Sequence, residues 1–339
     1  MSYALLSPNP GLTHRTGTSV TDRTPHVSGH DSGVLPVSDR VLFPVHLGVA
    51  KELVHLCHDD AVLCTGRQRL GAHRFAVTAA WPAGTSVPRP GHGTHHDGIV
   101  VAQTIRQAAL LLAHAEYGAP LAHATLLRTF DFAIDPAWPG SPDRPTALDI
   151  DVTAEETGHR GGRPTGVRLR MTVTSAGRAV GTADTAFEWI PPAVYRRLRG
   201  AYARAVDVQP PLPAPVPVDP SVLGRTGPHQ IAVGATDRPD RWVLRTDFSD
   251  TALYDHPVDH VPGLALIEAA QQIATLITAP HTFLPADTRT TFDRYVEFDQ
   301  PCHLTARTTR GAGTLAVEVS GHQAGELVFR TTVTGPFHP

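Results

Sequence analysis

The sequence has little lysine and little cysteine. Lys51 is the only lysine, so nearly all of the 29 basic residues are arginine. The three cysteines, Cys57, Cys64 and Cys302, form no Cys-x-x-Cys pair. This argues against a zinc ribbon, a redox motif or a disulfide framework in so long a chain. We therefore expect a protein of a reducing compartment, the cytoplasm.

Long apolar runs and a strong net charge are also missing. No stretch reaches about 18 consecutive apolar residues, so no transmembrane helix is expected, and the first residues lack the pattern of a signal peptide. A formal net charge of −3 provides no overall field that favours nucleic acid or an anionic membrane. What is present is 41% hydrophobic residues, enough to fill a core.

Proline and small polar residues divide the chain. Residues 1–40 are rich in Ser, Thr, Gly, Pro and His with little apolar periodicity, which predicts a flexible tail. Residues 208–220 are dense in proline, which disfavours both helix and central strand and predicts a linker at 201–226. Two folded parts remain, 41–200 and 227–336.

The two folded parts resemble each other. Each contains one nearly apolar run with helical periodicity, which begins after Gly98 in the first part and after Gly263 in the second. Alignment of these glycines pairs Gln103 with Glu268, Arg106 with Gln271, and Gln107 with Gln272. The alternative is a chance similarity of two helices rich in alanine and leucine.

Segments with the period of a β-strand flank both helices. They are residues 61–65, 73–79, 148–152, 167–173 and 183–189 in the first part, and 230–233, 242–248, 291–298, 315–319 and 327–333 in the second. An antiparallel sheet wrapped around a central helix satisfies this order. We therefore predict an α+β protein made of tandem hotdog folds that form an internal pseudo-dimer.

Titratable residues lie directly before and inside the second helix. Asp-His-Pro-Val-Asp-His, residues 255–260, precedes a Pro-Gly pair, and Glu268 is the only acid within the helix. Burial of such groups costs folding energy unless they are paired, so the segment indicates a functional site. Glu268 is a candidate general base, and burial is expected to raise its pKa. The alternative for Glu268 is a structural carboxylate paired with Arg106 or a backbone donor.

His256 and His260 are the other candidate bases. The free N–H groups of Gly263 and Leu264 at the helix start suit an oxyanion. Asp255 is a further catalytic candidate. With Asp259, it either fixes an imidazole tautomer or only caps a turn before the helix.

No metal site is expected in this segment. Pro257 and Pro262 prevent a regular helix from presenting both histidines on one face. A second histidine cluster, residues 92–97, occupies the same place before the first helix. It is expected to shape a pocket mouth or an exposed loop.

The chain resembles the A-factor biosynthesis (AfsA-type) hotdog-repeat family over about residues 45–335. The matching segments are Lys51-Glu-Leu-Val-His55, Arg74 to Trp81, the first central helix, Leu253 to Gly263 with Glu268, and Phe292 to Cys302. The resemblance implies a synthase of γ-butyrolactone or furan signalling molecules in secondary metabolism. Such an acyltransferase moves a β-ketoacyl group from an acyl carrier protein to a hydroxyl of dihydroxyacetone phosphate, with no cofactor.

The resemblance also bears on the substrate-binding residues. Its helix motif, Glu-x-x-Arg-Gln, is split here, since the first half has Gln103 with Arg106 and the second has Glu268 with Gln271. We expect Arg106 to reach from the first helix into one site shared with Glu268 and the His/Asp segment. Arg106 and Arg294 are the candidate phosphate ligands, and Gln103 and Gln271 complete the expected substrate-binding set.

Two other function classes stay open. A hotdog dehydratase or thioesterase would use acyl thioesters without a phosphorylated acceptor, and the Pro-Gly-x4-Glu spacing resembles that of hotdog dehydratases. A non-catalytic acyl-binding or signal-binding protein is favoured by glutamine, in place of glutamate, at position 103. The acyl chain length, the exact acceptor and the formation of a homo-oligomer are left open.

Overall fold

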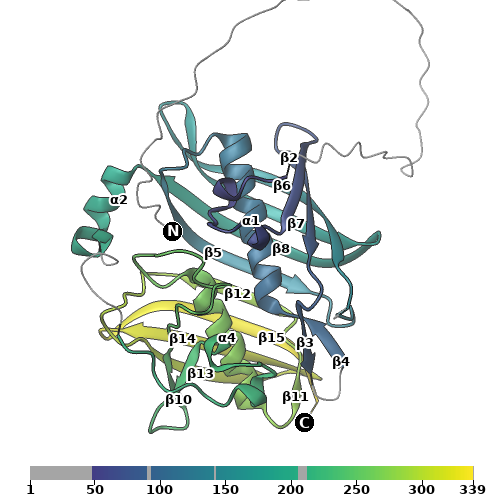
Figure 1. Ribbon diagram of the computed structural model, residues 1–339, viewed down its shortest axis with the longest axis vertical. Helices are drawn as coiled ribbons and strands as arrows, with labels where there is room; N and C mark the ends of the chain where they lie inside the picture. The colour runs from purple at the N-terminus through teal and green to yellow at the C-terminus, as the bar shows by residue number, and fades with distance from the viewer. Residues whose placement is uncertain (1–47, 90–92, 141–142, 205–211, 339) are drawn as a thin grey trace, which may run out of the picture.

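One antiparallel sheet of thirteen strands runs through both halves of the chain (Figure 1). The computed structural model describes residues 48–89, 93–140, 143–204 and 212–338. The tail predicted for residues 1–40 lies outside these ranges, as does the part of the predicted linker at 205–211. The described remainder of that linker forms short 3₁₀ turns and a single β-bridge between Pro217 and Gly234.

The first half contains eight strands and two α-helices in its described residues. In chain order they are β1 Cys64–Arg69, β2 Arg74–Trp81, β3 Ser86–Arg89, β4 Gly93–His96, α1 Gly98–Tyr117, β5 Ala124–Ile134, β6 Thr146–Arg160, β7 Arg163–Ser175, β8 Arg178–Ile190 and α2 Pro192–Arg199. The 3₁₀ turns η1 Lys51–Val54 and η2 Asp59–Ala61 precede them, and η3 Gly200–Arg204 follows. Strands β3 and β4 form a separate pair.

The second half repeats this plan with shorter leading strands. Its elements are η4 Pro220–Leu223, η5 Pro228–Gln230, β9 Val233–Ala235, β10 Arg241–Leu244, α4 Gly263–Thr278, β11 Thr282–Phe283, β12 Asp287–Phe292, β13 His303–Arg310, β14 Thr314–Gln323 and β15 Glu326–His338. The strand order across the sheet is β1-β2-β6-β7-β8-β5-β12-β15-β14-β13-β10-β9, and the thirteenth strand, β11, pairs with β15 beside this path. Each half is therefore a sheet with one central helix.

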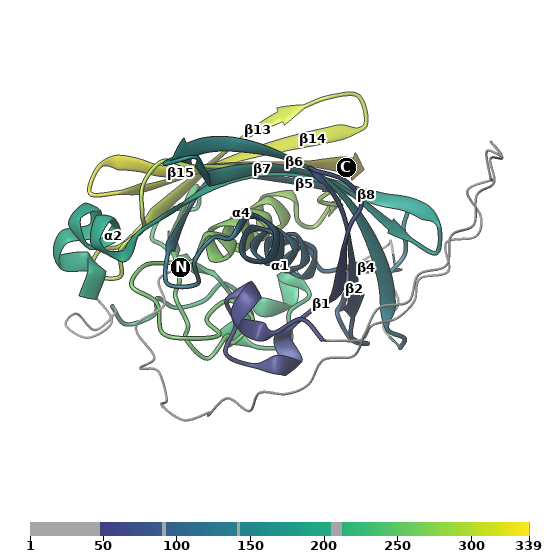
Figure 2. The same ribbon diagram turned by 90° about the horizontal axis from the view of Figure 1, so that it is seen from above.

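Strands β5 and β12 join the halves. They pair antiparallel, with Phe130 opposite Thr290, so the sheet continues without an edge from one half to the other. Figure 2 shows α1 and α4 side by side within the curve of this sheet. The predicted tandem hotdog pseudo-dimer is confirmed.

Helix α1 is a core helix although its length and composition would allow it to cross a membrane. Most of its apolar window, 72%, is buried inside the protein. Asp97 caps its start by accepting a hydrogen bond from the N–H of Ile99, and Gly118 ends it in the left-handed conformation. Sheet and α4 together cover it, which explains why its residues are apolar on nearly every face.

Several predicted strands need correction. β7 shows the expected alternation, with Leu169 and Met171 buried and Arg168 and Arg170 exposed. The strand predicted at 291–298 is wrong, because β12 ends at Phe292. The Gln323 side chain replaces a strand partner there: it accepts from the N–H of Glu297 and donates to the carbonyls of residues 297 and 300. The strand predicted at 230–233 is also wrong, because η5 ends at Gln230 and β9 begins only at Val233. Strands β5 and β13 were not predicted.

Candidate active site

A cavity of about 640 Å³ opens beside the start of α4. Its walls come from α1, α4, β5, β8, the loop that follows β12, and α2 with η3. Apolar lining residues include Ala109, Leu110, Leu126, Phe130, Phe187 and Leu266. The polar lining includes Arg106, Arg199, His260, Arg294 and Glu297. The cavity therefore combines an apolar wall with a cluster of groups that can carry charge.

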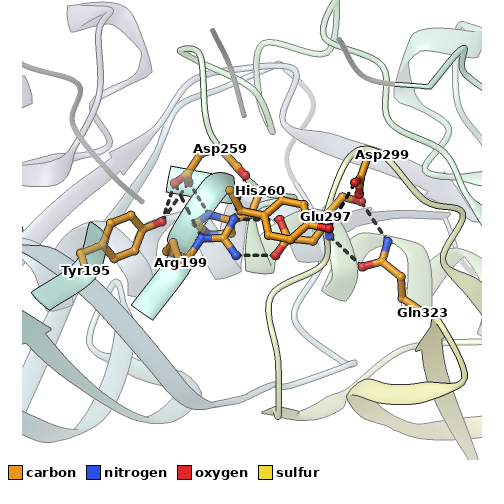
Figure 3. Close-up of polar contacts among 8 residues, drawn as sticks. Tyr195, Arg199, Asp259, His260, Glu297, Asp299 and Gln323 are labelled. Carbon is orange, nitrogen blue, oxygen red and sulfur yellow. Dashed lines mark hydrogen bonds and ion pairs between the residues drawn. The ribbon is translucent and has the colours of Figure 1, made fainter. Parts of the chain in front are cut away.

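His260 and Asp259 form a hydrogen-bonded pair at this cavity (Figure 3). The Nδ1 atom of His260 lies 2.7 Å from Oδ1 of Asp259. The Tyr195 hydroxyl donates to the same carboxylate at 2.7 Å, and Nε of Arg199 lies 3.8 Å from it. Asp259 thus has three partners that hold its charge and its orientation.

The pKa values of this pair keep His260 neutral and Asp259 ionised at neutral pH. Burial, the largest influence, lowers the pKa of His260 to about 4, since only 8% of the residue is exposed. Burial alone would raise the pKa of Asp259, but hydrogen bonds from His260 and Tyr195 and the charge of Arg199 lower it to about 2. At neutral pH, Asp259 is ionised and His260 is neutral.

The ionised carboxylate determines the tautomer of His260. Because Asp259 can only accept, Nδ1 of His260 carries the proton and Nε2 keeps a lone pair. Within the described part of the chain, Nε2 has no hydrogen-bond partner. His260 lines the cavity, so a neutral imidazole with a free acceptor stands at its wall.

Helix α2 holds this pair in place. Arg199 donates to Oε2 of Glu297 at 2.8 Å and to the carbonyl of Asp259 at 2.9 Å. Its guanidinium also lies 4.2 Å from the ring centre of Tyr295, whose ring meets that of His260 edge to face. The arrangement in Figure 3 explains why the conformation of His260 is fixed from several sides.

Sequence reasoning missed Tyr195, Arg199 and Glu297. Tyr195 and Arg199 are four residues apart on a short helix that begins with proline, so they share one face. That spacing was a usable signal. Their partners, 64 and 98 residues further along, could not be found from local sequence.

The start of α4 provides backbone donors. Pro262 precedes the helix and no side chain caps it, so the N–H groups of Gly263 and Leu264 are not used by a cap. Both residues line the cavity. A Cβ at Gly263 would lie 3.1 Å from the Phe292 ring, so glycine keeps this wall open.

The two arginines predicted to bind phosphate line the same cavity but differ in exposure. Arg106 is 7% exposed, and it donates to the carbonyls of Val54 at 3.3 Å and His55 at 3.4 Å. The Arg294 side chain is 62% exposed and forms an ion pair with Glu326 at 3.2 Å. The structure thus brings together His260, Gly263, Leu264, Arg106 and Arg294 from the predicted set.

Five other predicted residues do not line the cavity: Asp255, His256, Gln103, Glu268 and Gln271. Oδ2 of Asp255 accepts from the N–H of Cys57 at 2.5 Å and lies 3.3 Å from Nδ1 of His256. Gln103 donates to the carbonyl of Ala252 at 2.5 Å. These contacts hold the segment before α4 against α1 and the residues that follow η1. Cys57, Asp255 and His256 also place metal-ligating atoms within 4.8 Å of one another.

Glu268 lies apart from the cavity lining, which corrects the expected shared site. Its carboxylate is 2.5 Å from Nη2 of Arg225 and accepts from Gln272 at 2.7 Å. Arg225 also pairs with Asp97, the cap of α1. Burial raises the pKa of Glu268, and Arg225 opposes that shift. The partner of Glu268 is therefore Arg225 and not Arg106, because the end of the predicted linker lies between Asp97 at the start of α1 and Glu268 on α4.

Gln271 on α4 corresponds to Arg106 on α1 in the aligned repeats. It lies at the start of α1, as Arg106 lies at the cavity beside the start of α4. A space of about 30 Å³ there is lined by Gly98, His95, His96, Trp138 and Gln271. Gln271 donates to Thr288 at 3.1 Å and packs so tightly that a Cβ at Gly98 would lie 2.2 Å from its Oε1. The start of α1 is therefore filled, whereas the start of α4 is open.

Comparison with known proteins agrees with this architecture. The A-factor biosynthesis hotdog domain matches residues 39–191 and 206–338. A 2-oxo-3-(phosphooxy)propyl 3-oxoalkanoate synthase of Streptomyces coelicolor is 40% identical over 78% of this chain and 84% of its own. The synthase of the same name from Streptomyces virginiae is 38% identical over 83% and 95%.

Among solved structures, the 12:0-ACP thioesterase from Umbellularia californica has a TM-score of 0.49 and 12% identity, covering 80% of this chain and 99% of its own. Both halves of the present chain match the family domain, and the relatives align over most of its length. The chain therefore belongs to the A-factor biosynthesis hotdog family.

Proposed function

We propose that this protein is an acyltransferase that esterifies a hydroxyl of dihydroxyacetone phosphate, or of a similar glycerol-type acceptor, with a β-ketoacyl group. The donor is the thioester of an acyl carrier protein. The name of the relatives describes such an ester, a 3-oxoalkanoate of a phosphorylated three-carbon ketone. The observation that carries the proposal is the neutral His260, held by Asp259 at an open cavity beside the uncapped start of α4.

In this reaction His260 is the general base. Its Nε2 takes the proton of the acceptor hydroxyl while the oxygen attacks the thioester carbonyl. The imidazolium that forms is stabilised by Asp259, which Tyr195 and Arg199 keep ionised. When the carbon–sulfur bond breaks, the sulfur leaves as a thiolate and receives this proton. The ester and the free thiol are the products.

The start of α4 supports the charge that develops on the carbonyl oxygen. The N–H groups of Gly263 and Leu264 point out of the helix end and carry its positive partial charge. Donors of this kind stabilise a tetrahedral oxyanion more than the ground-state carbonyl. A large side chain at Gly263 would meet Phe292 and disturb this geometry.

The remaining walls suit the two ends of the product. Ala109, Leu110, Phe130 and Phe187 provide the apolar surface for an acyl chain. Arg106 and Arg294 are the candidate phosphate ligands. Replacing each by methionine separates their roles. Loss of an arginine that binds the phosphate should raise KM for the acceptor and leave KM for the thioester unchanged.

The direct test is acceptor-dependent product formation. The protein is incubated with a β-ketoacyl thioester, with and without dihydroxyacetone phosphate, and mass spectrometry detects the phosphorylated ester or the butenolide formed by its cyclisation. His260→Gln should lower the rate by roughly a hundredfold to ten-thousandfold. His256→Gln is the matched control, because His256 belongs to the same segment but does not line the cavity.

The outcomes separate the candidate functions. Thioester hydrolysis at the same rate with and without the acceptor would indicate a thioesterase and contradict the proposal. Binding without any product would indicate a non-catalytic acyl-binding protein.

We also expect a cytoplasmic location and a role in making a signalling-molecule precursor, and the three free cysteines agree with a reducing compartment.

A further inference from the structure

Helix α2 has two chemically different faces. Its inner face carries Tyr195 and Arg199, both buried against the loop that contains Asp259. Its outer face carries two exposed apolar side chains, Val194 at 43% and Leu198 at 60% exposure. Figures 1 and 2 show α2 at the side of the molecule, outside the curve of the sheet. The outer face therefore has no cover within the described part of the chain.

Unpaired positive charge surrounds these apolar side chains. Arg196 and Arg197 on α2 and Arg204 on η3 are exposed, and α2 contains no acidic residue. Within the described ranges, none of the three forms an ion pair. The chain as a whole carries a formal charge of −3, so this basic cluster is local and not a reflection of overall composition.

Acidic residues near the cavity do not neutralise this cluster. Glu297 is bound by Arg199, Glu326 by Arg294, and Glu188 lies 3.7 Å from Arg128. Asp299 accepts from Tyr202, and Asp293 belongs to the cavity lining. Glu297 and Glu326 are thus paired within the cavity wall and Glu188 is paired beside it, while the three arginines of α2 and η3 have no carboxylate partner in the described residues.

The exposed face is continuous with the cavity. Leu198 lines the cavity together with Arg199 and Tyr202, so one helix borders both the outer surface and the cavity. A partner bound to this face would sit directly at the opening. A flexible arm attached to that partner could then enter beside His260.

We propose that Val194, Arg196, Arg197, Leu198 and Arg204, here called the α2 face, form the docking surface for an acidic carrier protein. The carrier would present carboxylates to the arginines and an apolar side chain to Val194 and Leu198, while its thioester arm enters the cavity. This inference rests on the proposed acyl transfer. Charge complementarity of this kind speeds association and orients the partner.

The test compares two donors that carry the same acyl group. β-Ketooctanoyl is attached either to an acyl carrier protein or to N-acetylcysteamine, and transfer to dihydroxyacetone phosphate is measured for wild type and for Arg196→Glu/Arg197→Glu. The double variant should raise KM for the carrier-bound donor by roughly tenfold or more, because two attractive charges become repulsive. KM and kcat for the small thioester should be unchanged. Arg74→Glu on β2, across the molecule from α2 in Figure 2, is the control.

A second measurement does not depend on turnover. Fluorescence anisotropy of a labelled carrier protein without an acyl group should show weaker binding to the double variant than to wild type, and addition of salt should weaken the wild-type complex. Unchanged carrier binding and KM would overturn the docking proposal and leave the acyl transfer intact. Carrier binding that depends on the α2 face, without ester formation from either donor, would overturn the proposed function alone.

Discussion

His260 is expected to make the protein sensitive to acid over a defined range of pH. Burial lowers the pKa of its imidazole from 6.5 to about 4 in the folded protein. Below about pH 6.5 the unfolded chain takes up a proton at this residue while the folded protein does not. The stability associated with the neutral side chain is therefore complete above that pH and falls as the pH approaches about 4.

The expected magnitude follows from the shift in pKa. Each unit corresponds to about 1.4 kcal/mol, so His260 alone should lower the free energy of unfolding by ~3 kcal/mol across this range. Asp259 does not contribute there. Its pKa falls from 3.8 to about 2, so its stabilising effect is lost only at pH values below 3.8.

The assay is urea unfolding of wild type and His260→Gln at a series of pH values. Other histidines, among them the buried His55 and the half-buried His96 and His114, also have pKa values lowered by burial. Their effect is common to both proteins and cancels in the difference. Wild type minus variant should therefore decrease by ~3 kcal/mol between about pH 7 and about pH 4. A difference that is independent of pH would refute the claim that His260 is buried and neutral.

Three further predictions concern neighbouring groups. Tyr195→Phe removes a donor to the ionised Asp259 and should lower the free energy of unfolding by about 1.5–3 kcal/mol, with a fall in kcat and little change in KM for the acceptor; an unchanged kcat would show that Tyr195 does not position the pair. Arg225→Met leaves Glu268 buried without its cation and should cost roughly 3–5 kcal/mol in urea unfolding. Adding Glu268→Gln should recover part of that loss, and no recovery would contradict the pairing. Ala109→Phe adds a large side chain to the apolar wall of the cavity, so kcat/KM should fall more for long acyl thioesters than for short ones. An equal fall would show that the acyl chain does not bind along this wall.

The fold could be predicted because its main signals are local. The central helices begin at Gly98 and Gly263 as the aligned repeats indicate, and their apolar faces reflect enclosure by one sheet. The strand predicted at 291–298 failed for a tertiary reason. Gln323, on another strand, satisfies the backbone where the alternation favoured a strand partner.

The site could be predicted only in part. The histidine and aspartate segment led to His260, which the structure places at the cavity, but its spacing could not distinguish His260 from His256. The ion pair of Glu268 depends on Arg225, a residue inside the predicted linker with no local pattern to mark it. Contacts of this kind are determined by how the chain returns to the helix starts, which sequence periodicity does not describe.

The seam between β5 and β12 has a consequence for how this protein can change over time. In a dimer of identical chains, every substitution appears twice, so Arg106 and Gln271 could not occupy corresponding positions. Because one covalent chain forms both halves, each position mutates alone. Gln271 can fill the space at Gly98 without closing the opening at Gly263. The space at the start of α1 can thereby stay filled while the cavity at the start of α4, which both halves line, acquires new substrates.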